Sequence, residues 1–492
     1  MTEFNADWVG ERFPDAKPDT AAANELHRSQ LRLAERLAAR YGERLRHAHG
    51  LGWLVWDQTR WARDVDGEPM RAAIAVVKQA AQEAGRDNDG DLAKDVRAAE
   101  RMNALRGILE IAACLRPLAV AAAALDADPY LFNCMNGTLD LRTGALRDHD
   151  PADLITKRAG CGLDPAASGP TYDKFISEIL PDEAVHEFVQ RLMGYAMLGK
   201  VVEHVLPLFV GVGANGKTTL IETLKAAFGD YAIAAEPELL VERDYAHPTG
   251  QADLQGTRLA VATETDEGRR LAAATVKRLT GGEKIRARRM RMDFIEFPPS
   301  HTLIMVTNHK PKVSGDDPAI WRRLLVTPFD VVIAAPDGTL PDRLALELPR
   351  VLAWACEGYR AYAERGLEPP EAVRKRTDDY RASSDTVGRF LGEETVESTF
   401  ARVGARDLYN AWASWCDRTG EVSGTEVTFA ETMGNRGFPK RKSHGVQTYL
   451  GIGLKADVVW RCDGCGEIST LDMTGGGHGC GGHWQISLKA DK

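Results

Sequence analysis

One eight-residue stretch constrains this chain more than any other. Residues Gly211-Val212-Gly213-Ala214-Asn215-Gly216-Lys217-Thr218 match the pattern G-x-x-x-x-G-K-[ST]. The apolar run LPLFV at 206–210 predicts a strand before it, and apolar spacing predicts a helix from Lys217 to about Phe228. Glycines in such a loop let backbone N–H groups point at phosphate oxygens beside the positive end of a helix, whereas a chance glycine-rich turn would lack the flanking elements.

The loop therefore predicts a nucleotide site. We expect Lys217 to reach the β- and γ-phosphates of ATP and Thr218 to ligate Mg²⁺. The residues expected to bind the nucleotide are Gly211, Gly213, Asn215, Gly216, Lys217, Thr218 and Thr219.

Further short apolar runs follow the loop and alternate with helical patterns. They are RLAVAT at 258–263, HTLIMVTN at 301–308 and RLLVTPF at 323–329. Strands that alternate with helices predict an α/β fold with a mainly parallel sheet. Residues 341–382 are expected to be helical, with Trp354 and Tyr359 inward.

Polar residues at the ends of these runs are candidates for catalysis. Glu264 follows a strand and could hold Mg²⁺ and orient water, with Asp266 and Glu267 as substitutes, although a solvated acidic loop is the plain alternative. Asn308 ends the next strand, where an amide could position the attacking water or merely form a turn. Arg322 and Arg323 could supply an arginine finger to a neighbouring subunit, or could be surface arginines.

The charge distribution predicts where a polyanion would bind. The 492-residue chain has a net charge of −9, yet residues 277–293 carry seven basic side chains against two acidic ones. Basic side chains on a strand and loop would bind DNA phosphates without reading sequence, whereas the alternatives are a solvated hairpin or contacts to a neighbouring subunit's nucleotide. The candidate DNA-binding residues are Lys284, Arg286, Arg288, Arg289 and Arg291.

A second basic stretch lies at 432–456 and contains no acidic residue. Two predicted helices, at 404–417 and about 427–435, precede a predicted hairpin that carries Lys440, Arg441 and Lys442. This order is typical of a winged-helix module, in which the wing grips backbone phosphate.

Three of the eight cysteines gather near the end of the sequence. Cys462, Cys465, Cys480 and His483 have the spacing of a zinc ribbon, with His478 as an alternative fourth ligand and a flexible reduced tail as the plain alternative. We therefore predict a structural Zn²⁺ site. The first residues have no signal-peptide pattern and no apolar run is long enough to span a bilayer, so we expect a cytoplasmic protein without membrane contact.

The N-terminal third is expected to be mostly helical. Residues 20–48 have helical spacing, the stretch with Trp53, Trp56 and Trp61 predicts short strands, and turn signals at Asn136-Gly137 and Thr143-Gly144 predict a pair of hairpins. Helices are expected again at about 171–199.

Taken in order, the motifs resemble those of a superfamily 3 helicase. They are more closely similar to the C-terminal part of phage and plasmid primase-helicases related to the poxvirus primase-helicase. The stretches that carry the resemblance are GVGANGKTT, RLAVATETDEGRRL, VKRLTGGEKIRARRM, LIMVTNHKPKV, DPAIWRRLLVTPF and, upstream, NGTLDLRTGAL.

The resemblance implies an AAA+-like ATPase core that assembles as a homo-hexameric ring. ATP would bind between subunits, with Lys217, Thr218 and Glu264 from one subunit and Arg322 or Arg323 from the next. The 277–293 hairpin would line the pore and move along single-stranded or forked DNA. Many relatives carry an N-terminal primase domain for which this chain has too few residues, so primer synthesis is not expected, and a separate primase or polymerase is a possible partner.

These expectations divide the chain into five parts. They are a flexible tail at 1–18, a helicase-associated N-terminal domain at 19–200, the ATPase domain at 201–385, a winged-helix-like module at 386–456 and a zinc knuckle at 457–492. The leading hypothesis is an ATP-dependent replicative DNA helicase of a phage or mobile element. Its rivals are a DNA-binding ATPase that loads at an origin or acts in defence without unwinding, and a small-molecule kinase that uses the same loop.

Overall fold

The structure is a computed structural model. It describes residues 29–242, 249–263, 269–288, 294–313, 317–443, 446–462, 468–469 and 484–488. The chain forms two compact units, of which the first contains residues up to Arg158 together with 291–295 and the second contains the remainder.

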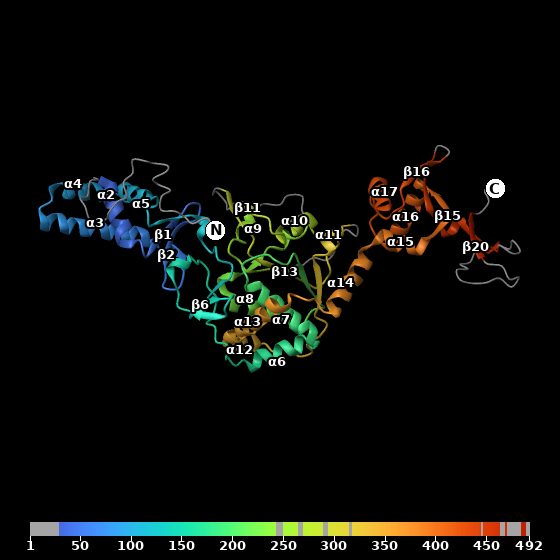
Figure 1. The fold of residues 1–492 in the computed structure, drawn as a ribbon, viewed down its shortest axis with the longest axis horizontal. Helices are drawn as coiled ribbons and strands as arrows, with labels where there is room; N and C mark the ends of the chain where they lie inside the picture. Colours follow the sequence, from blue (N-terminus) through green and yellow to red (C-terminus); the bar gives the residue numbers. More distant parts are fainter. Residues whose placement is uncertain are drawn as a thin grey trace. The chain divides into compact units, whose positions relative to one another are not determined.

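The first unit combines a helical cluster with two small sheets (Figure 1). Apolar residues at helical spacing bury one face of each helix in a shared core that includes Leu33, Leu37 and Ile108. The helices are α2 (Ser29–Tyr41), α3 (Glu68–Asp87), α4 (Gly90–Ala99) and α5 (Met102–Ala112). One sheet has the order β3-β2-β1-β4 and the other the order β5-β6-β7. Their strands are β1 (Leu45–Ala48), β2 (Gly52–Trp56), β3 (Trp61–Arg63), β4 (Ala119–Val120), β5 (Leu131–Cys134), β6 (Gly137–Asp140) and β7 (Ala145–Arg147).

A five-stranded sheet organises the second unit. Its order is β14-β8-β13-β10-β9, and every neighbouring pair is parallel. The strands are β8 (Leu206–Val210), β9 (Ala232–Ala235), β10 (Leu259–Thr263), β13 (Thr302–Thr307) and β14 (Leu324–Pro328). All six residues of β13 are buried, as expected for the central strand of a covered parallel sheet. The mixed α/β fold with a parallel sheet is thus confirmed.

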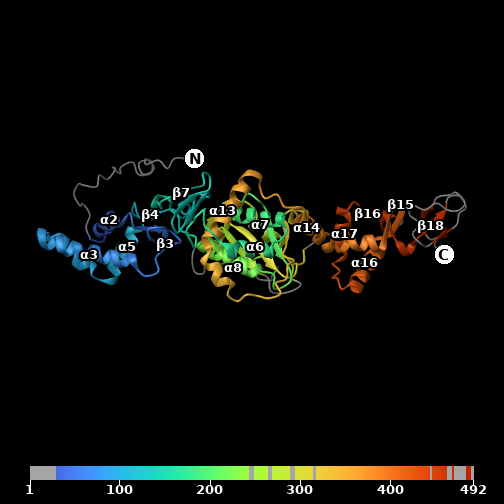
Figure 2. The ribbon, with the colours of Figure 1, turned by 90° about the horizontal axis from the view of Figure 1, so that it is seen from below.

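Helices pack around this sheet (Figures 1 and 2). Helix α8 contacts β9, β10 and α13, while α14 packs on β14. Helices α7 and α13 lie so close that a Cβ on Gly194 would come within 2.0 Å of the Tyr359 nitrogen. The helices are α6 (Pro170–Ile179), α7 (Glu183–Met197), α8 (Lys217–Phe228), α9 (Thr249–Ala252), α10 (Ala273–Leu279), α11 (Pro318–Trp321), α12 (Leu340–Leu346), α13 (Leu348–Arg365) and α14 (Glu371–Ser384). Strands β11 (Ile285–Arg288) and β12 (Phe294–Phe297) form a separate two-stranded sheet. In the sequence they lie between β10 and β13.

A smaller cluster of helices and strands follows α14. Its core contains Phe390, Trp412, Trp415 and Phe429, and Trp412 stacks on Phe429 with ring centroids 4.6 Å apart. The elements are α15 (Thr386–Glu394), β15 (Thr395–Gly404), α16 (Ala405–Thr419), α17 (Glu426–Asn435), β16 (Lys440–Ser443) and β17 (Val446–Leu454). Strands β15, β17 and β16 form one antiparallel sheet, and β18 (Val458–Cys462), β19 (Ile468–Ser469) and β20 (Trp484–Leu488) form another.

Most elements expected from the sequence lie where the apolar patterns place them. The helix predicted to begin at Lys217 begins there, and the helices at 404–417 and 427–435 are α16 and α17. The helix predicted to continue to residue 48 ends at Tyr41, because 45–48 pairs in register with β2 and β4. Among the described residues, no helix combines the length and the apolarity needed to cross a bilayer. The five-part division remains a prediction, and the tail at 1–18 lies outside the described residues.

Candidate nucleotide and nucleic-acid sites

The glycine-rich loop lies between β8 and α8, at the carboxyl edge of the parallel sheet. Val210 pairs with Thr307 of β13, so Gly211 and Asn308 are the next residues on two adjacent strands. The carboxyl edge of a parallel sheet is where α/β proteins bind ligands. The register therefore brings two of the sequence-predicted residue groups together at one place.

The Lys217 ammonium occupies the centre of this loop. Its Nζ donates to the Gly211 carbonyl at 2.7 Å, to Asn215 Oδ1 at 3.1 Å and to Asn308 Oδ1 at 3.2 Å. The residue is only 4% exposed, and burial lowers its pKa. All three acceptors are neutral, and within the described ranges no carboxylate forms an ion pair with Lys217. A buried cation of this kind is an electrostatic complement for an anion.

The loop conformation requires glycine at two positions. Gly216 has φ +79°, and a Cβ there would meet Ile179 Cγ2 at 2.5 Å. A Cβ on Gly211 would lie 2.1 Å from the Phe329 carbonyl oxygen. Asn215 is buried, and its Nδ2 donates to that same carbonyl at 3.0 Å. The segment after β14 therefore fixes the loop.

The other predicted loop residues lie at its outer side. Gly213 and Thr218 are exposed, and Thr218 lies in the first turn of α8, which begins at Lys217. Thr219 is partly buried in the same turn. Thr218 thus lies at a helix N-terminus, where the partial positive charge of the helix favours an anionic ligand.

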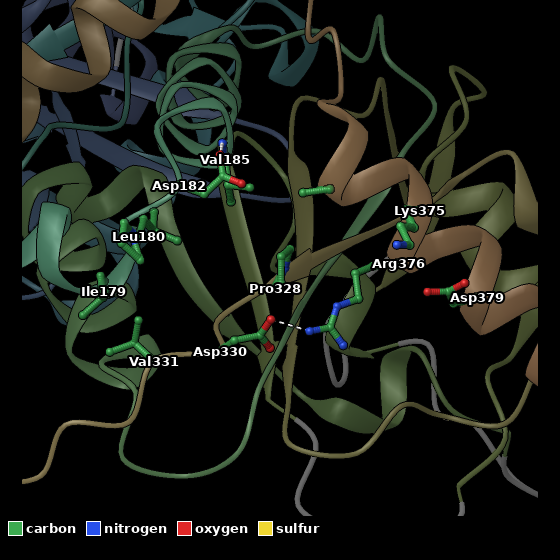
Figure 3. A pocket seen from close by; sticks show the side chains of 12 residues that line it. Ile179, Leu180, Asp182, Val185, Pro328, Asp330, Val331, Lys375, Arg376 and Asp379 are labelled. Carbon is green, nitrogen blue, oxygen red and sulfur yellow. Dashed lines mark hydrogen bonds and ion pairs between the residues drawn. The ribbon is translucent and has the colours of Figure 1, made fainter.

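A cavity of about 480 Å³ adjoins the loop (Figure 3). Ile179, which contacts Gly216, forms part of its wall, as do Pro328 and Asp330 beside Phe329. The remaining wall residues are Leu180, Pro181, Asp182, Val185, Val331, Ala372, Lys375, Arg376 and Asp379. Arg376 of α14 pairs with Asp330 across the opening. Sequence reasoning missed this cavity because its walls come from three distant segments, and only their folding onto the loop identifies them.

The three acidic candidates follow β10 in the sequence. Thr263 pairs with Val306, so the chain leaves β10 at the same edge as Asn308. Glu264, Asp266 and Glu267 lie outside the described residues. The assignment of Glu264 to catalysis and Mg²⁺ stays a prediction.

Arg322 and Arg323 occupy the opposite edge of the sheet. Leu324 pairs with Leu206 and Pro328 with Val210, so the two arginines precede the amino end of β14 while the loop follows the carboxyl end of β8. The intervening five residues span about 16 Å of strand. Neither arginine lies at the same edge of the sheet as the glycine-rich loop of its own chain.

The two arginines also differ in their contacts. Arg323 Nη1 donates to the Ala319 carbonyl at 2.8 Å, and its backbone carbonyl accepts from Leu206 at 2.6 Å. Arg322 is exposed, and within the described part of the chain its side chain has no recorded hydrogen bond or ion pair. Arg323 therefore helps to hold the strand start, and Arg322 points to solvent.

Strand β11 presents the first basic stretch. Ile285 and Ala287 are buried, whereas Arg286 and Arg288 alternate with them and are exposed. Lys284 is exposed just before the strand. Arg289 and Arg291 lie outside the described residues.

Strand β16 presents the second basic stretch. Its register sets Lys440 opposite Tyr449, Arg441 opposite Thr448 and Lys442 opposite Gln447. Lys440 lies 3.9 Å from a Glu426 carboxylate oxygen, while Arg441 and Lys442 are exposed. The order of α16, α17 and a basic hairpin is as the sequence predicts.

Most of the predicted zinc ligands lie outside the described residues. Cys465, Cys480, His483 and the alternative His478 lie outside the described residues, and for Cys462 only the backbone at the end of β18 is described. Within the described residues, no group of three or more potential metal ligands occurs.

Two known families match parts of this chain. The family described as D5 N terminal like matches residues 34–181, and a family of unknown function, DUF5906, matches residues 209–323. The second match contains the whole glycine-rich loop, Asn308 and both arginines.

Several viral proteins are similar in sequence. "Putative helicase L207/L206" of Acanthamoeba polyphaga mimivirus is 27% identical over 319 residues, which cover 59% of this chain and 33% of that protein. "Putative helicase 022R" of Frog virus 3 is 23% identical, covering 59% and 39%. "Putative primase C962R" of African swine fever virus (isolate Tick/Malawi/Lil 20-1/1983) is 23% identical, covering 59% and 34%. The matched region is thus well under half the length of each of these relatives.

Among solved structures, the C-terminal region of NrS-1 in its A form is similar at 12% identity. The match covers 86% of this chain and all of that one, with a TM-score of 0.49. The N-terminal family match and the viral relatives confirm the resemblance that the motifs predict. These matches show a D5-N-terminal-like region and similarity to viral proteins named putative helicases or primases, consistent with a primase-helicase of the poxvirus type.

Proposed function

We propose that this chain is one subunit of an ATP-dependent DNA helicase, active as a homo-hexameric ring on single-stranded or forked DNA. The observation that carries the proposal is the buried Lys217 ammonium, which three neutral oxygens hold inside a glycine-rich loop at the carboxyl edge of a parallel sheet. Relatives named as helicases from several large DNA viruses support it.

In this proposal the triphosphate of ATP binds over the loop. When ATP binds, the Lys217 ammonium would leave its three neutral acceptors and bind β- and γ-phosphate oxygens. These oxygens carry negative charge, which none of the three neutral acceptors does. The Thr218 hydroxyl would ligate Mg²⁺, with Glu264 as the predicted second ligand, and the metal would neutralise charge on the transferring phosphate. Asn308, whose Oδ1 accepts a hydrogen bond from Lys217, would orient the attacking water.

The nucleoside would occupy the cavity beside Ile179. A volume of about 480 Å³ is large enough for a purine ring, and the lining combines apolar residues with five charged ones, Asp182, Asp330, Lys375, Arg376 and Asp379. The Asp330–Arg376 pair links the segment after β14 to α14 at this opening. This arrangement would let a bound base connect the loop to α14.

The position of Arg322 supports a site shared between subunits. Because Arg322 precedes the amino end of β14, it lies a full strand away from the loop of its own chain. A second subunit could bring its Arg322 to the γ-phosphate, as the resemblance implies. Arg322 is favoured over Arg323 because Arg323 is already bonded to Ala319.

The basic strands would bind DNA through its phosphates. Exposed Lys284, Arg286 and Arg288 would face the pore of the ring, and Arg441 and Lys442 would grip backbone phosphate outside it. A structural Zn²⁺ held by Cys462, Cys465, Cys480 and His483 remains part of the proposal on spacing alone. Metal analysis of the purified protein should find about one Zn²⁺ per chain.

A strand-displacement assay tests this function. Purified chain, ATP and Mg²⁺ should separate a forked DNA duplex, and Lys217→Ala should lower DNA-stimulated ATP hydrolysis by about two to three orders of magnitude and abolish displacement. Lys225→Ala is the matched control, because Lys225 lies on the same helix but pairs with Glu222. DNA-stimulated hydrolysis without displacement would instead favour the DNA-binding ATPase, and hydrolysis without any DNA binding at low salt would favour the small-molecule kinase.

A further inference from the structure

Helix α10 and helix α11 are joined by one ion pair. Lys277 Nζ, in the last turn of α10, lies 2.7 Å from Asp317 Oδ2. Asp317 is the N-cap of α11, and its other oxygen accepts from the Ala319 nitrogen at 3.0 Å. A single carboxylate therefore closes the first turn of α11 and binds α10 at the same time.

Each of the two helices joined by this ion pair precedes basic residues in the chain. Leu279 ends α10, and β11 with its exposed Arg286 and Arg288 begins at Ile285. On the other side, Arg322 follows α11 immediately, and its backbone nitrogen donates to Pro318 at 3.2 Å. The ion pair thus joins the helix that precedes the basic strand to the helix that precedes Arg322.

The other contacts of α11 lie in the core, whereas the ion pair with α10 is partly exposed. Ile320 and Trp321 are buried, and Trp321 packs edge-on against Tyr380 of α14 at 5.1 Å. The Lys277 and Asp317 side chains are 36% and 29% exposed, so water reaches the pair. A partly solvated ion pair of this kind contributes little to the stability of the fold.

We propose that the Lys277–Asp317 ion pair is a positioning contact that transmits DNA binding at β11 to Arg322, and so adjusts the arginine offered to the neighbouring subunit's nucleotide. The inference rests on the proposed function, since it assumes a ring in which Arg322 acts in trans. Lys277 lies on α10 rather than on the basic strand β11, and Asp317 caps α11, so the inference adds two residues outside the loop and strand that are proposed to bind nucleotide and DNA. It makes DNA stimulation of hydrolysis depend on them.

The test compares Asp317→Asn and Lys277→Gln with the intact chain. Asparagine caps a helix as well as aspartate does, so Asp317→Asn removes the charge and keeps the bond to Ala319. Basal ATP hydrolysis and nucleotide affinity should stay within about twofold, while stimulation by single-stranded DNA should fall about three- to tenfold, in the range of ordinary coupling between sites. Lys277→Arg should retain most of the stimulation, and the double variant should be no worse than either single one.

The outcomes are distinct. Unchanged stimulation in Asp317→Asn, or additive losses in the double variant, would overturn the proposal and leave the helicase function intact. A parallel fall of basal hydrolysis and melting temperature, with the stimulation ratio unchanged, would show a purely structural contact and also overturn it. Absence of any stimulation in the intact chain would overturn the proposed function together with this inference.

Discussion

The carboxyl edge of the sheet, which holds the glycine-rich loop, and the basic strand β16 are built in opposite ways. At the edge, Lys217 and Asn215 are each 4% exposed and interlocked by hydrogen bonds with Gly211 and Phe329. On β16, Arg441 and Lys442 are exposed, and neither side chain forms a hydrogen bond or an ion pair with another described residue.

Under the proposed function, this difference would correspond to two kinds of anion recognition. A buried, preorganised cation acts in a medium of low dielectric. The loss of one charged or hydrogen-bonding group there should therefore have a large effect on the function of the site. Exposed cations act through counterion release, so each contributes modestly and the sum depends on salt. The following predictions separate these two modes, from the largest expected effect to the smallest.

The first prediction concerns acid stability at the amino end of β13. His301 is buried, and burial lowers its pKa from 6.5 to about 4. The neutral ring is therefore retained in the folded state while the unfolded chain binds a proton, so stability is complete above pH 6.5 and is lost as the pH falls towards 4. The loss should reach about 3 kcal/mol.

Chemical denaturation at several pH values measures this effect. In His301→Leu the free energy of unfolding should fall less steeply between pH 6.5 and 4 than in the intact chain. Parallel curves for the two proteins would show that the buried histidine does not account for acid sensitivity. A charge change on the exposed strand β16 should leave this pH dependence unaltered.

The second prediction concerns Asn308. Asn308→Ala should lower the rate of ATP hydrolysis about ten- to a hundredfold, because it removes the polar group that is proposed to orient the attacking water. ATP affinity should change little, since Lys217 and the glycine-rich loop, which are proposed to bind the phosphates, are unaltered. Steady-state hydrolysis and equilibrium nucleotide binding measure the two effects. A matching loss of affinity and rate would assign Asn308 to binding instead.

The third prediction concerns the exposed cations. Arg441→Ala combined with Lys442→Ala should weaken duplex DNA binding about tenfold at low salt and reduce the salt slope by about 1.8. Arg418→Ala is the control, because Arg418 is an exposed arginine that pairs with Glu394. Binding isotherms at several salt concentrations measure both quantities. An unchanged slope would remove these two residues from the DNA contact.

The sequence predicted the elements around the nucleotide edge well, because each depends on local signals. The loop motif, the helix start at Lys217 and the buried strand 302–307 all follow from spacing and apolar runs. The same signals failed at 45–48, where pairing with β2 and β4 outweighed helical spacing.

What the sequence did not predict depends on contacts between distant segments. The cavity beside Ile179 needs α14 to approach the segment after β14, and no local pattern encodes that approach. The difference between Arg322 and Arg323 likewise arises from one bond to Ala319 and from the register of β14 on β8.

The central claim is a nucleotide site completed by a second subunit, and a mixing experiment tests it most directly. Lys217→Ala and Arg322→Ala should each be inactive alone. Equimolar mixing should restore ATP hydrolysis at about a quarter of the interfaces, where an intact loop meets an intact arginine. Failure to recover activity in rings shown to contain both variants, or full activity of Arg322→Ala alone, would contradict the account.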